Sequence, residues 1–333
     1  MRKFWDERQR LHCPVAEFFN GALHPAAEHP GRIDAILEAI GPTEGPRDHG
    51  IEPILAVHDP DYVDLLRTAH DEWLAAGRSG DAFPYCFPIV GRRALDLTRI
   101  DARLGQHSFD TSTPIGAGTW EACYWSAQTA LAALDAVLVD RDRNAFALTR
   151  PPGHHAGRDY LGGYSYLNTA AIAAEAAIAA GTTRVAILDV DYHHGNGTQD
   201  IFAGREDVAF ASIHADPAVD YPFFWGHADE SAGNILNLPL PRGTDWAAYE
   251  PALTKALDWL SGFAPELLIV SYGADTWAGD PISHFQLATA DYTLMARRIA
   301  AFGLPTLILM EGGYAVEALG SNVASFLSGF SRR

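Results

Sequence analysis

The sequence predicts a single α/β domain, spanning residues 1–333, with a mostly parallel multi-stranded sheet and helices on both of its faces. Short apolar runs recur along the chain, as is typical of strands that are buried on both faces. Segments with apolar residues at helical spacing alternate with these runs, and this alternation is typical of a doubly wound α/β fold. No linker, repeat or low-complexity tract interrupts the order, so we expect one domain.

Five apolar runs are predicted to form strands, and three segments between them are predicted to form helices. The strand runs are 145–150, 184–191, 208–216, 267–275 and 305–313. The helical segments are 168–181, which Gly181 would end, 246–263 and 288–303. Residues 76–118, rich in Gly, Pro and aromatic residues, are expected to form a long insertion loop. Loops of that size usually serve function or make interfaces.

The composition excludes several classes of protein. A chain with 48% apolar and 20% charged residues is an ordinary globular protein, and no apolar run reaches the length of a membrane span. The formal charge of −18 argues against nucleic acid as a ligand. Three scattered cysteines argue against a disulfide framework, and the charged first residues lack the apolar core of a secretory signal. We therefore expect a cytoplasmic protein with no nucleic-acid or membrane partner.

Polar clusters follow four of the predicted strands, and the strongest signal for a metal is in ILDVDYHHGNG, residues 187–197. Because side chains alternate along a strand, Asp191 and His193 are expected to point the same way, with Asp189 one pleat further in and His194 pointing away. Ligands bind at the carboxyl ends of such strands, so Asp275 should join them. Two carboxylates and one imidazole leave positions open for water and substrate, as a catalytic zinc requires. One ion per chain is expected, and Zn²⁺, Fe²⁺, Co²⁺ and Mn²⁺ all suit these ligands.

Several motifs resemble those of the zinc-dependent deacetylases of the arginase–deacetylase fold. They are RPPGHHAG, GGYSYLNTAAIAA, ILDVDYHHGNGTQDIF, SIHAD, GADTWAGDPI and MEGGY. Within these enzymes, the chain is most similar to bacterial acetylpolyamine amidohydrolases and class II histone deacetylase-like amidohydrolases. The resemblance is dense between residues 145 and 314 and thinner before them, where VHDPDYVDLL and GTWEA match.

The resemblance implies a role for each matching residue. The zinc ligands would be Asp191, His193 and Asp275, and the catalytic residues beside them would be His154, His155 and Tyr314. Asp189 and Asn196 would be the partners of the two histidines, and Gly163 and Tyr164 would belong to the tunnel wall. A structural K⁺ or Na⁺ would be bound by Asp189, Asp191, His193, Ser212 and Ile213. The implied reaction is hydrolysis of a linear amide by metal-activated water, with His155 moving the proton and Tyr314 stabilising the oxyanion.

The substrate is expected to be a small acetylated amine, above all an acetylpolyamine. Acetyl-lysine in proteins is the alternative, and a non-catalytic protein that binds acetylated ligands is a third interpretation. Discrimination should depend on loops at the tunnel mouth. Candidate walls are Phe224 and Trp225, and Ile282 is apolar where some eukaryotic polyamine deacetylases have a glutamate. The resemblance also implies a homodimer in which the insertion loop narrows the partner's tunnel, and Asp101, Asp110 and Glu121 are acids near this loop that are either solvated or at the rim.

A binuclear manganese ureohydrolase shares the expected fold but needs two further carboxylates. Its metal sites require the patterns D-x-H-x-D and S-x-D-x-D. Here Gly195 and Gly273 stand where those patterns need an aspartate, so a second metal would lack ligands.

Overall fold

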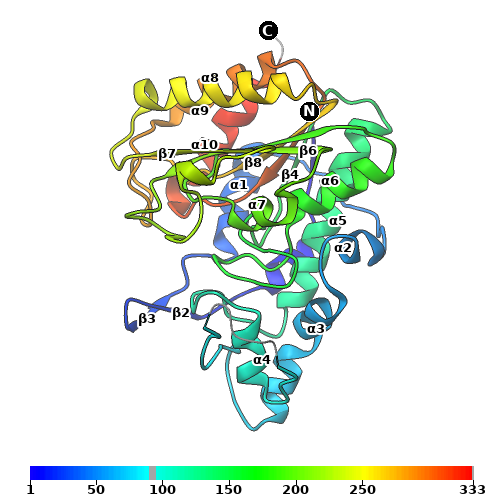
Figure 1. Ribbon diagram of the computed structural model, residues 1–333, viewed down its shortest axis with the longest axis vertical. Helices are drawn as coiled ribbons and strands as arrows, with labels where there is room; N and C mark the ends of the chain where they lie inside the picture. Colours follow the sequence, from blue (N-terminus) through cyan, green and yellow to red (C-terminus); the bar gives the residue numbers. More distant parts are fainter. Residues whose placement is uncertain (90–94, 332–333) are drawn as a thin grey trace.

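The computed structural model describes residues 1–89 and 95–331, and its centre is a seven-stranded sheet (Figure 1). The strands of this sheet are β1 (Arg2–Phe4), β4 (Asn144–Ala147), β5 (Val185–Asp189), β6 (Val208–Ala215), β7 (Ile235–Leu240), β8 (Leu267–Tyr272) and β9 (Thr306–Met310). Their order is β1-β4-β9-β8-β5-β6-β7, and every neighbouring pair is parallel. A separate antiparallel hairpin consists of β2 (Ala16–Phe19) and β3 (Ala22–Pro25). The predicted parallel α/β fold is confirmed.

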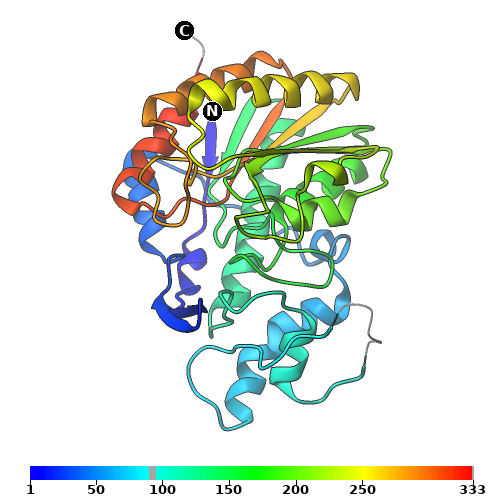
Figure 2. The ribbon, with the colours of Figure 1, turned by 60° about the vertical axis from the view of Figure 1, so that its left-hand side comes forward.

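Helices cover both faces of the sheet (Figures 1 and 2). They are α1 (Gly31–Ile40), α2 (Glu52–Leu55), α3 (Pro60–Ala75), α4 (Ile100–Gln106), α5 (Thr119–Leu138), α6 (Thr169–Ala179), α7 (Asn196–Phe202), α8 (Trp246–Gly262), α9 (Thr289–Ala301) and α10 (Val316–Gly329), with short 3₁₀ turns η1 (Glu7–Leu11) and η2 (Ala228–Glu230). The strands alternate between two cores, so that in β5 Val185 and Ile187 pack with α5 and α6, whereas Ala186 and Leu188 pack with α8, α9 and α10.

The five predicted strands and three predicted helices are all present, but the strands end earlier than expected. β5 ends at Asp189 rather than at residue 191. The chain turns there because Asp189 Oδ1 accepts a hydrogen bond from the Asp191 amide at 3.1 Å, and Asp191 Oδ1 accepts one from the His193 amide at 2.9 Å. The alternation rule therefore does not apply to Asp191 and His193, and consecutive turns place these side chains instead.

The described residues of the segment 76–118, which are 76–89 and 95–118, include regular structure. It contains α4, and a bridge between Ala82 and Ile115 closes it near its ends. Together with α3, it forms the part of the molecule most distant from the sheet (Figures 1 and 2). Within residues 1–89 and 95–331, no helix combines the length and apolar character that a membrane span requires.

His58, between α2 and α3, should make folding stability depend on pH. Its Nε2 accepts a hydrogen bond from the Asn168 amide at 2.9 Å, so the folded protein holds the ring neutral. Burial lowers its pKa from 6.5 to about 4. The folded pKa is the lower one, so this group stabilises the fold above pH 6.5 and loses that contribution as the pH falls towards 4.

We expect His58→Gln to reduce the slope of the unfolding free energy against pH between 6.5 and 4 by about one proton, or about 1.4 kcal/mol per pH unit. Urea unfolding at a series of pH values measures this slope. Equal slopes for the two proteins would contradict the assignment.

Candidate metal and active site

The site lies where the topology of the sheet reverses. From β5 the chain moves outward to β6 and β7, and then it crosses back to β8 on the other side of β5 and continues to β9. Neighbouring strands whose connections run in opposite directions leave a crevice at their carboxyl ends, and ligands bind there in open α/β sheets. Asp191 follows β5 and Asp275 follows β8, so the fold brings both carboxylates to this crevice.

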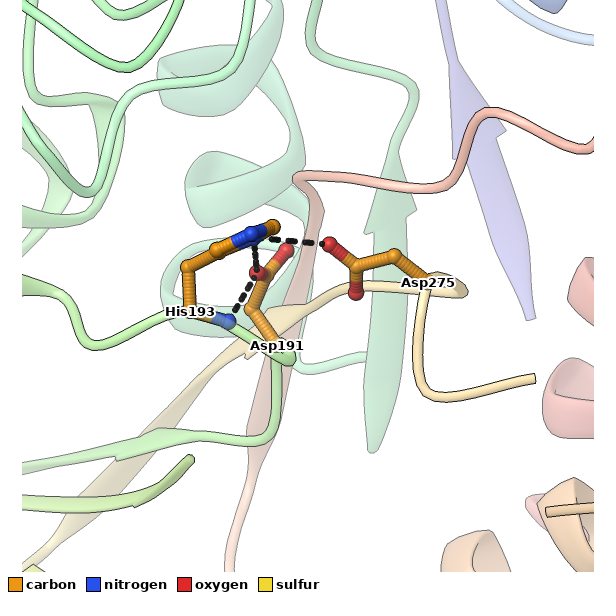
Figure 3. A group of neighbouring side chains, drawn as sticks. All are labelled: Asp191, His193 and Asp275. Atoms are coloured by element: carbon orange, nitrogen blue, oxygen red, sulfur yellow. Dashed lines mark hydrogen bonds and ion pairs between the residues drawn. The ribbon is translucent and has the colours of Figure 1, made fainter. Parts of the chain in front are cut away.

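Asp191, His193 and Asp275 converge on one point (Figure 3). One ligand atom from each lies within 4.8 Å of the others. His193 Nδ1 is 3.2 Å from Asp275 Oδ2 and 3.5 Å from Asp191 Oδ1. Backbone amides orient both carboxylates, since Gly312 donates to Asp191 Oδ2 at 2.8 Å and Tyr192 donates to Asp275 Oδ1 at 3.0 Å. Two oxygens and one nitrogen so arranged form a set that a divalent ion can bind.

Glycines allow the carboxylates to approach the backbone this closely. A Cβ atom at Gly273 would lie 2.0 Å from Asp191 Oδ2, and one at Gly312 would lie 2.5 Å from Asp275 Oδ2. A Cβ atom at Gly195 would lie 2.2 Å from Asp189 Oδ2. Gly195 and Gly273 are the two positions where a binuclear site would need aspartate. A side chain at either would collide with the carboxylates already present, which supports a site for one ion.

The charge of the triad also fits a bound cation. Burial, followed by the Asp191 carboxylate, raises the pKa of Asp275 to about 7. Burial opposes protonation of His193, but its hydrogen bonds with Asp191 and Asp275 raise its pKa to about 9. Two buried carboxylates repel each other unless a positive charge lies between them. A divalent ion held by these three residues would supply that charge.

The tandem histidines have different partners. His154 Nδ1 lies 2.9 Å from Asp189 Oδ2, whereas His155 Nδ1 lies 2.7 Å from Asn196 Oδ1. Burial opposes protonation of His154, yet Asp189 and Asp191 raise its pKa to about 10. Burial, followed by the neighbouring rings of His154 and His193, lowers the pKa of His155 well below 6.5. The carboxylate partner therefore favours a charged ring at His154, whereas burial and the two neighbouring rings keep His155 neutral.

His194, beside the ligand His193, belongs to another cluster. It is fully buried, its Nε2 lies 3.1 Å from Asn237 Oδ1, and its ring centroid is 4.5 Å from that of His214. These contacts account for the side chain without a metal.

Three residues that the sequence analysis did not identify fix the loop that carries Tyr314. Asp280 Oδ2 accepts hydrogen bonds from the amides of Tyr314 at 2.7 Å and of Ala315 at 3.2 Å. Arg32 donates to the Gly313 carbonyl at 2.7 Å, and its guanidinium lies 4.8 Å from the centre of the Tyr314 ring. Burial raises the pKa of Tyr314 well above 10, so its hydroxyl keeps the proton. The third residue is Glu311, whose Oε2 accepts a hydrogen bond from the Gly153 amide at 2.7 Å and so joins this loop to the tandem histidines.

Gly163 and Tyr164 form a wall with unusual backbone geometry. Both have positive φ, +55° and +63°. A Cβ atom at Gly163 would lie 2.2 Å from His155 Cδ2, so glycine is required there. Asp110 Oδ2 accepts from the Gly163 amide at 2.7 Å, and Thr113 Oγ1 accepts from the Tyr164 amide at 2.9 Å. Strained backbone persists where its surroundings fix it, as is common at ligand sites.

A cavity of about 420 Å³ leads from the surface to these residues. Of the predicted site residues, it is lined by His155, Gly163, Tyr164, His193, Ile282 and Tyr314. Phe224 and Trp225 are not among the lining residues. Phe224 is 82% exposed, and Trp225 packs against Phe109.

Tyr221 and Phe223, rather than Phe224 or Trp225, supply the aromatic wall from this stretch. The ring centroid of Tyr221 is 5.2 Å from that of His155, and its hydroxyl donates to Asp110 Oδ2 at 2.9 Å. The other lining residues that the sequence did not indicate are Glu17, Phe19, Asn20, Ser112, Val219, Asp220, Arg242, Pro281 and His284. Apart from Pro281, which belongs to GADTWAGDPI, no quoted motif contains them, because they come from segments far apart in the sequence.

The three acids near the insertion loop have separate positions. Asp101 pairs with Arg78 and Arg99, and Glu121 accepts from the Trp125 indole. Neither lines the cavity, whereas Asp110 fixes its wall.

Of the residues predicted to bind a monovalent cation, Asp189 and Ser212 are paired in register on neighbouring strands, and Ile213 follows Ser212.

Comparisons with known proteins agree with this arrangement. Residues 25–330 match the family model described as histone deacetylase domain. Acetylpolyamine amidohydrolase 1 of Pseudomonas aeruginosa is 48% identical, with 99% of each chain covered, and acetylpolyamine amidohydrolase of Mycoplana ramosa is 43% identical, with 99% of each covered. The crystal structure of acetylpolyamine aminohydrolase from Burkholderia pseudomallei matches with a TM-score of 0.93 and 42% identity, covering 99% of this chain and 98% of that one. The chain belongs to the histone deacetylase family.

Proposed function

We propose that this protein is a metal-dependent amidohydrolase that removes acetyl groups from small acetylated amines, with acetylpolyamines as the preferred class. The observation that carries the proposal is the cavity itself, because His155, His193 and Tyr314 all line it. The names of the relatives in Pseudomonas and Mycoplana support the choice of substrate over acetyl-lysine in proteins.

We propose that Asp191, His193 and Asp275 hold one Zn²⁺. When bound, the ion would polarise the acetyl carbonyl and lower the pKa of a water molecule towards neutrality. The adjacent residues Asp189, Asp191, His193, Ser212 and Ile213 would hold a structural K⁺ or Na⁺.

In this mechanism His155 moves the proton. Its Nδ1–H donates to Asn196 Oδ1, which leaves Nε2 as the free acceptor. Nε2 would take a proton from the attacking water and return it to the leaving amine. His154, paired with Asp189, would orient the water and contribute positive charge. The un-ionised Tyr314 hydroxyl would donate a hydrogen bond to the oxyanion.

The proposal is tested by kcat/KM for acetylputrescine, acetylcadaverine, acetylspermidine and an acetyl-lysine peptide. We expect at least one acetylated polyamine to exceed the peptide tenfold or more, which is about 1.4 kcal/mol of transition-state discrimination. A preference for the peptide would assign the protein to the alternative class. Zinc binding without hydrolysis of any of the four would support a non-catalytic binding protein.

Asp280 should be a positioning residue for Tyr314. Its Oδ2 accepts hydrogen bonds from the amides of Tyr314 and Ala315, and its Oδ1 accepts one from the amide of Ile282. We expect Asp280→Ala to lower kcat about 10- to 100-fold with little change in KM, because the tyrosine hydroxyl acts mainly on the transition state. Asp280→Asn keeps one acceptor oxygen and should recover part of the loss. A rise in KM alone would show that the residue shapes the cavity instead.

We also propose a homodimer. Tyr85 and Ile89 of the segment 76–118 are 81% and 69% exposed, and Leu23 of the hairpin is 68% exposed. A hydrogen bond from the Phe18 amide to the Thr111 carbonyl joins the hairpin to the segment. Exposed apolar side chains suit an interface.

We propose a cytoplasmic location, because Cys13 and Cys86 are exposed and form no disulfide, which suits a reducing compartment.

A further inference from the structure

We propose that Glu17 determines substrate specificity by binding a free ammonium group of the substrate. The inference rests on the proposed function and narrows it. The preferred substrates would be acetylated amines that carry a second, positively charged amino group a few carbons from the acetamide.

Glu17 is a buried carboxylate with an incomplete set of partners. It lies on β2, lines the cavity and is 2% exposed. Its Oε1 accepts one long hydrogen bond, from the Ala27 amide at 3.4 Å. Among the described residues, no group donates a hydrogen bond to Oε2. Burial raises the pKa of Glu17, and the nearby Tyr164 hydroxyl only partly offsets this. Because an incompletely paired carboxylate is costly away from water, a cationic group in the cavity would gain by pairing with it.

The charges around the cavity leave Glu17 without a basic partner. The lining includes a second carboxylate, Asp220, and one guanidinium, Arg242. These two pair with each other, with both nitrogen–oxygen distances at 2.8 Å. His24 is opposite Glu17 on β3 and acts on its carboxylate electrostatically, but no ion pair joins the two side chains in the described part of the chain. The His24 ring lies instead against Phe19, with the ring centroids 4.1 Å apart.

Tyr164 is close both to Tyr314 and to Glu17. Its ring centroid is 5.5 Å from that of Tyr314. Burial raises the pKa of Tyr164, and the nearby Glu17 carboxylate is the next largest cause. A substrate with its acetyl group at Tyr314 and its alkyl chain along Tyr164 would bring a terminal ammonium to Glu17. An acetyl-lysine residue within a peptide would bring neutral backbone amides to the same place, and these gain little from a carboxylate.

The test compares acetylputrescine with N-pentylacetamide, in which a methyl group replaces the ammonium at the same chain position. We expect the zinc-loaded wild type to prefer acetylputrescine at least tenfold in kcat/KM. Glu17→Gln should remove most of that preference through a higher KM for acetylputrescine, while kcat/KM for the neutral amide stays within about twofold. Glu121→Gln, which makes the same change of charge outside the cavity, should keep the wild-type preference.

Two results would overturn the inference. Equal losses on both substrates would show that Glu17 only supports the wall around Tyr164, and an unchanged preference in Glu17→Gln would assign the ammonium to another group. Calorimetric binding of the two compounds separates this inference from the proposed function. If the wild type hydrolyses neither compound, a preference in binding that Glu17→Gln removes still supports the role of Glu17, whereas equal binding overturns it.

Discussion

Replacing Tyr314 by phenylalanine is expected to lower kcat about 100- to 1000-fold while leaving the metal content unchanged. Its hydroxyl keeps the proton, and Tyr314 lines the cavity together with His155 and His193. Loss of one preorganised donor to an oxyanion costs about 3–4 kcal/mol in other amide-cleaving enzymes. The phenyl ring should still pack under Arg32, so the fold and the triad should remain intact.

Steady-state kinetics with acetylputrescine, together with metal analysis of the same preparation, checks this prediction. Tyr249→Phe is a matched control, because it also removes the hydroxyl of a buried tyrosine, which in this case lies on α8. Activity within about threefold of wild type in Tyr314→Phe would exclude the hydroxyl from the reaction. A parallel loss of zinc would show that the residue acts on the metal site.

Replacing Asp275 by asparagine is expected to abolish both tight metal binding and hydrolysis. The substitution removes one of two anionic ligands from a site where the ligand atoms lie within 4.8 Å of one another. We expect the zinc affinity to fall at least about 100-fold. Replacing a residue that only hydrogen-bonds to a metal ligand already lowers metal affinity about 10- to 100-fold. The metal-free variant should be no less stable than the metal-free wild type, because burial already disfavours the charge on Asp275.

Thermal unfolding with and without zinc separates these effects. Excess zinc should raise the Tm of the wild type but not that of Asp275→Asn, because an ion stabilises only a fold that binds it. Asp216→Asn, which changes an aspartate that follows β6 and does not line the cavity, should behave as the wild type does. An equal rise of Tm in Asp275→Asn would remove Asp275 from the ligand set.

The sheet could be predicted from the sequence because its central strands are buried on both faces and therefore read as continuous apolar runs. β5, β8 and β9 are examples, and their residues are fully buried or nearly so. The edge strand β1 has only three residues and was not predicted. β7, which carries Asn237 and Pro239 within an apolar stretch, was also missed. An edge strand forms backbone hydrogen bonds to a neighbour on one side only and is less buried, so its run of apolar residues is shorter or interrupted.

The triad could be predicted because each ligand follows a strand in the sequence, although the reason given for Asp191 and His193 was wrong. Turns after Asp189 place them, not the pleat of a strand. The cavity wall could not be predicted in the same way. Glu17 and Tyr221 are 204 positions apart and meet only in the folded chain. The prediction that Phe224 and Trp225 line the wall was wrong, since Tyr221 of the same stretch lines it and they do not.

The measurement that tests the central claim most directly is zinc titration of the metal-free protein while acetate release from acetylputrescine is followed. A single-metal hydrolase predicts activity that rises linearly to one equivalent of zinc per chain and then stays constant. Full zinc binding with no acetate released would contradict the claim, as would activity that appears only after a second equivalent is added.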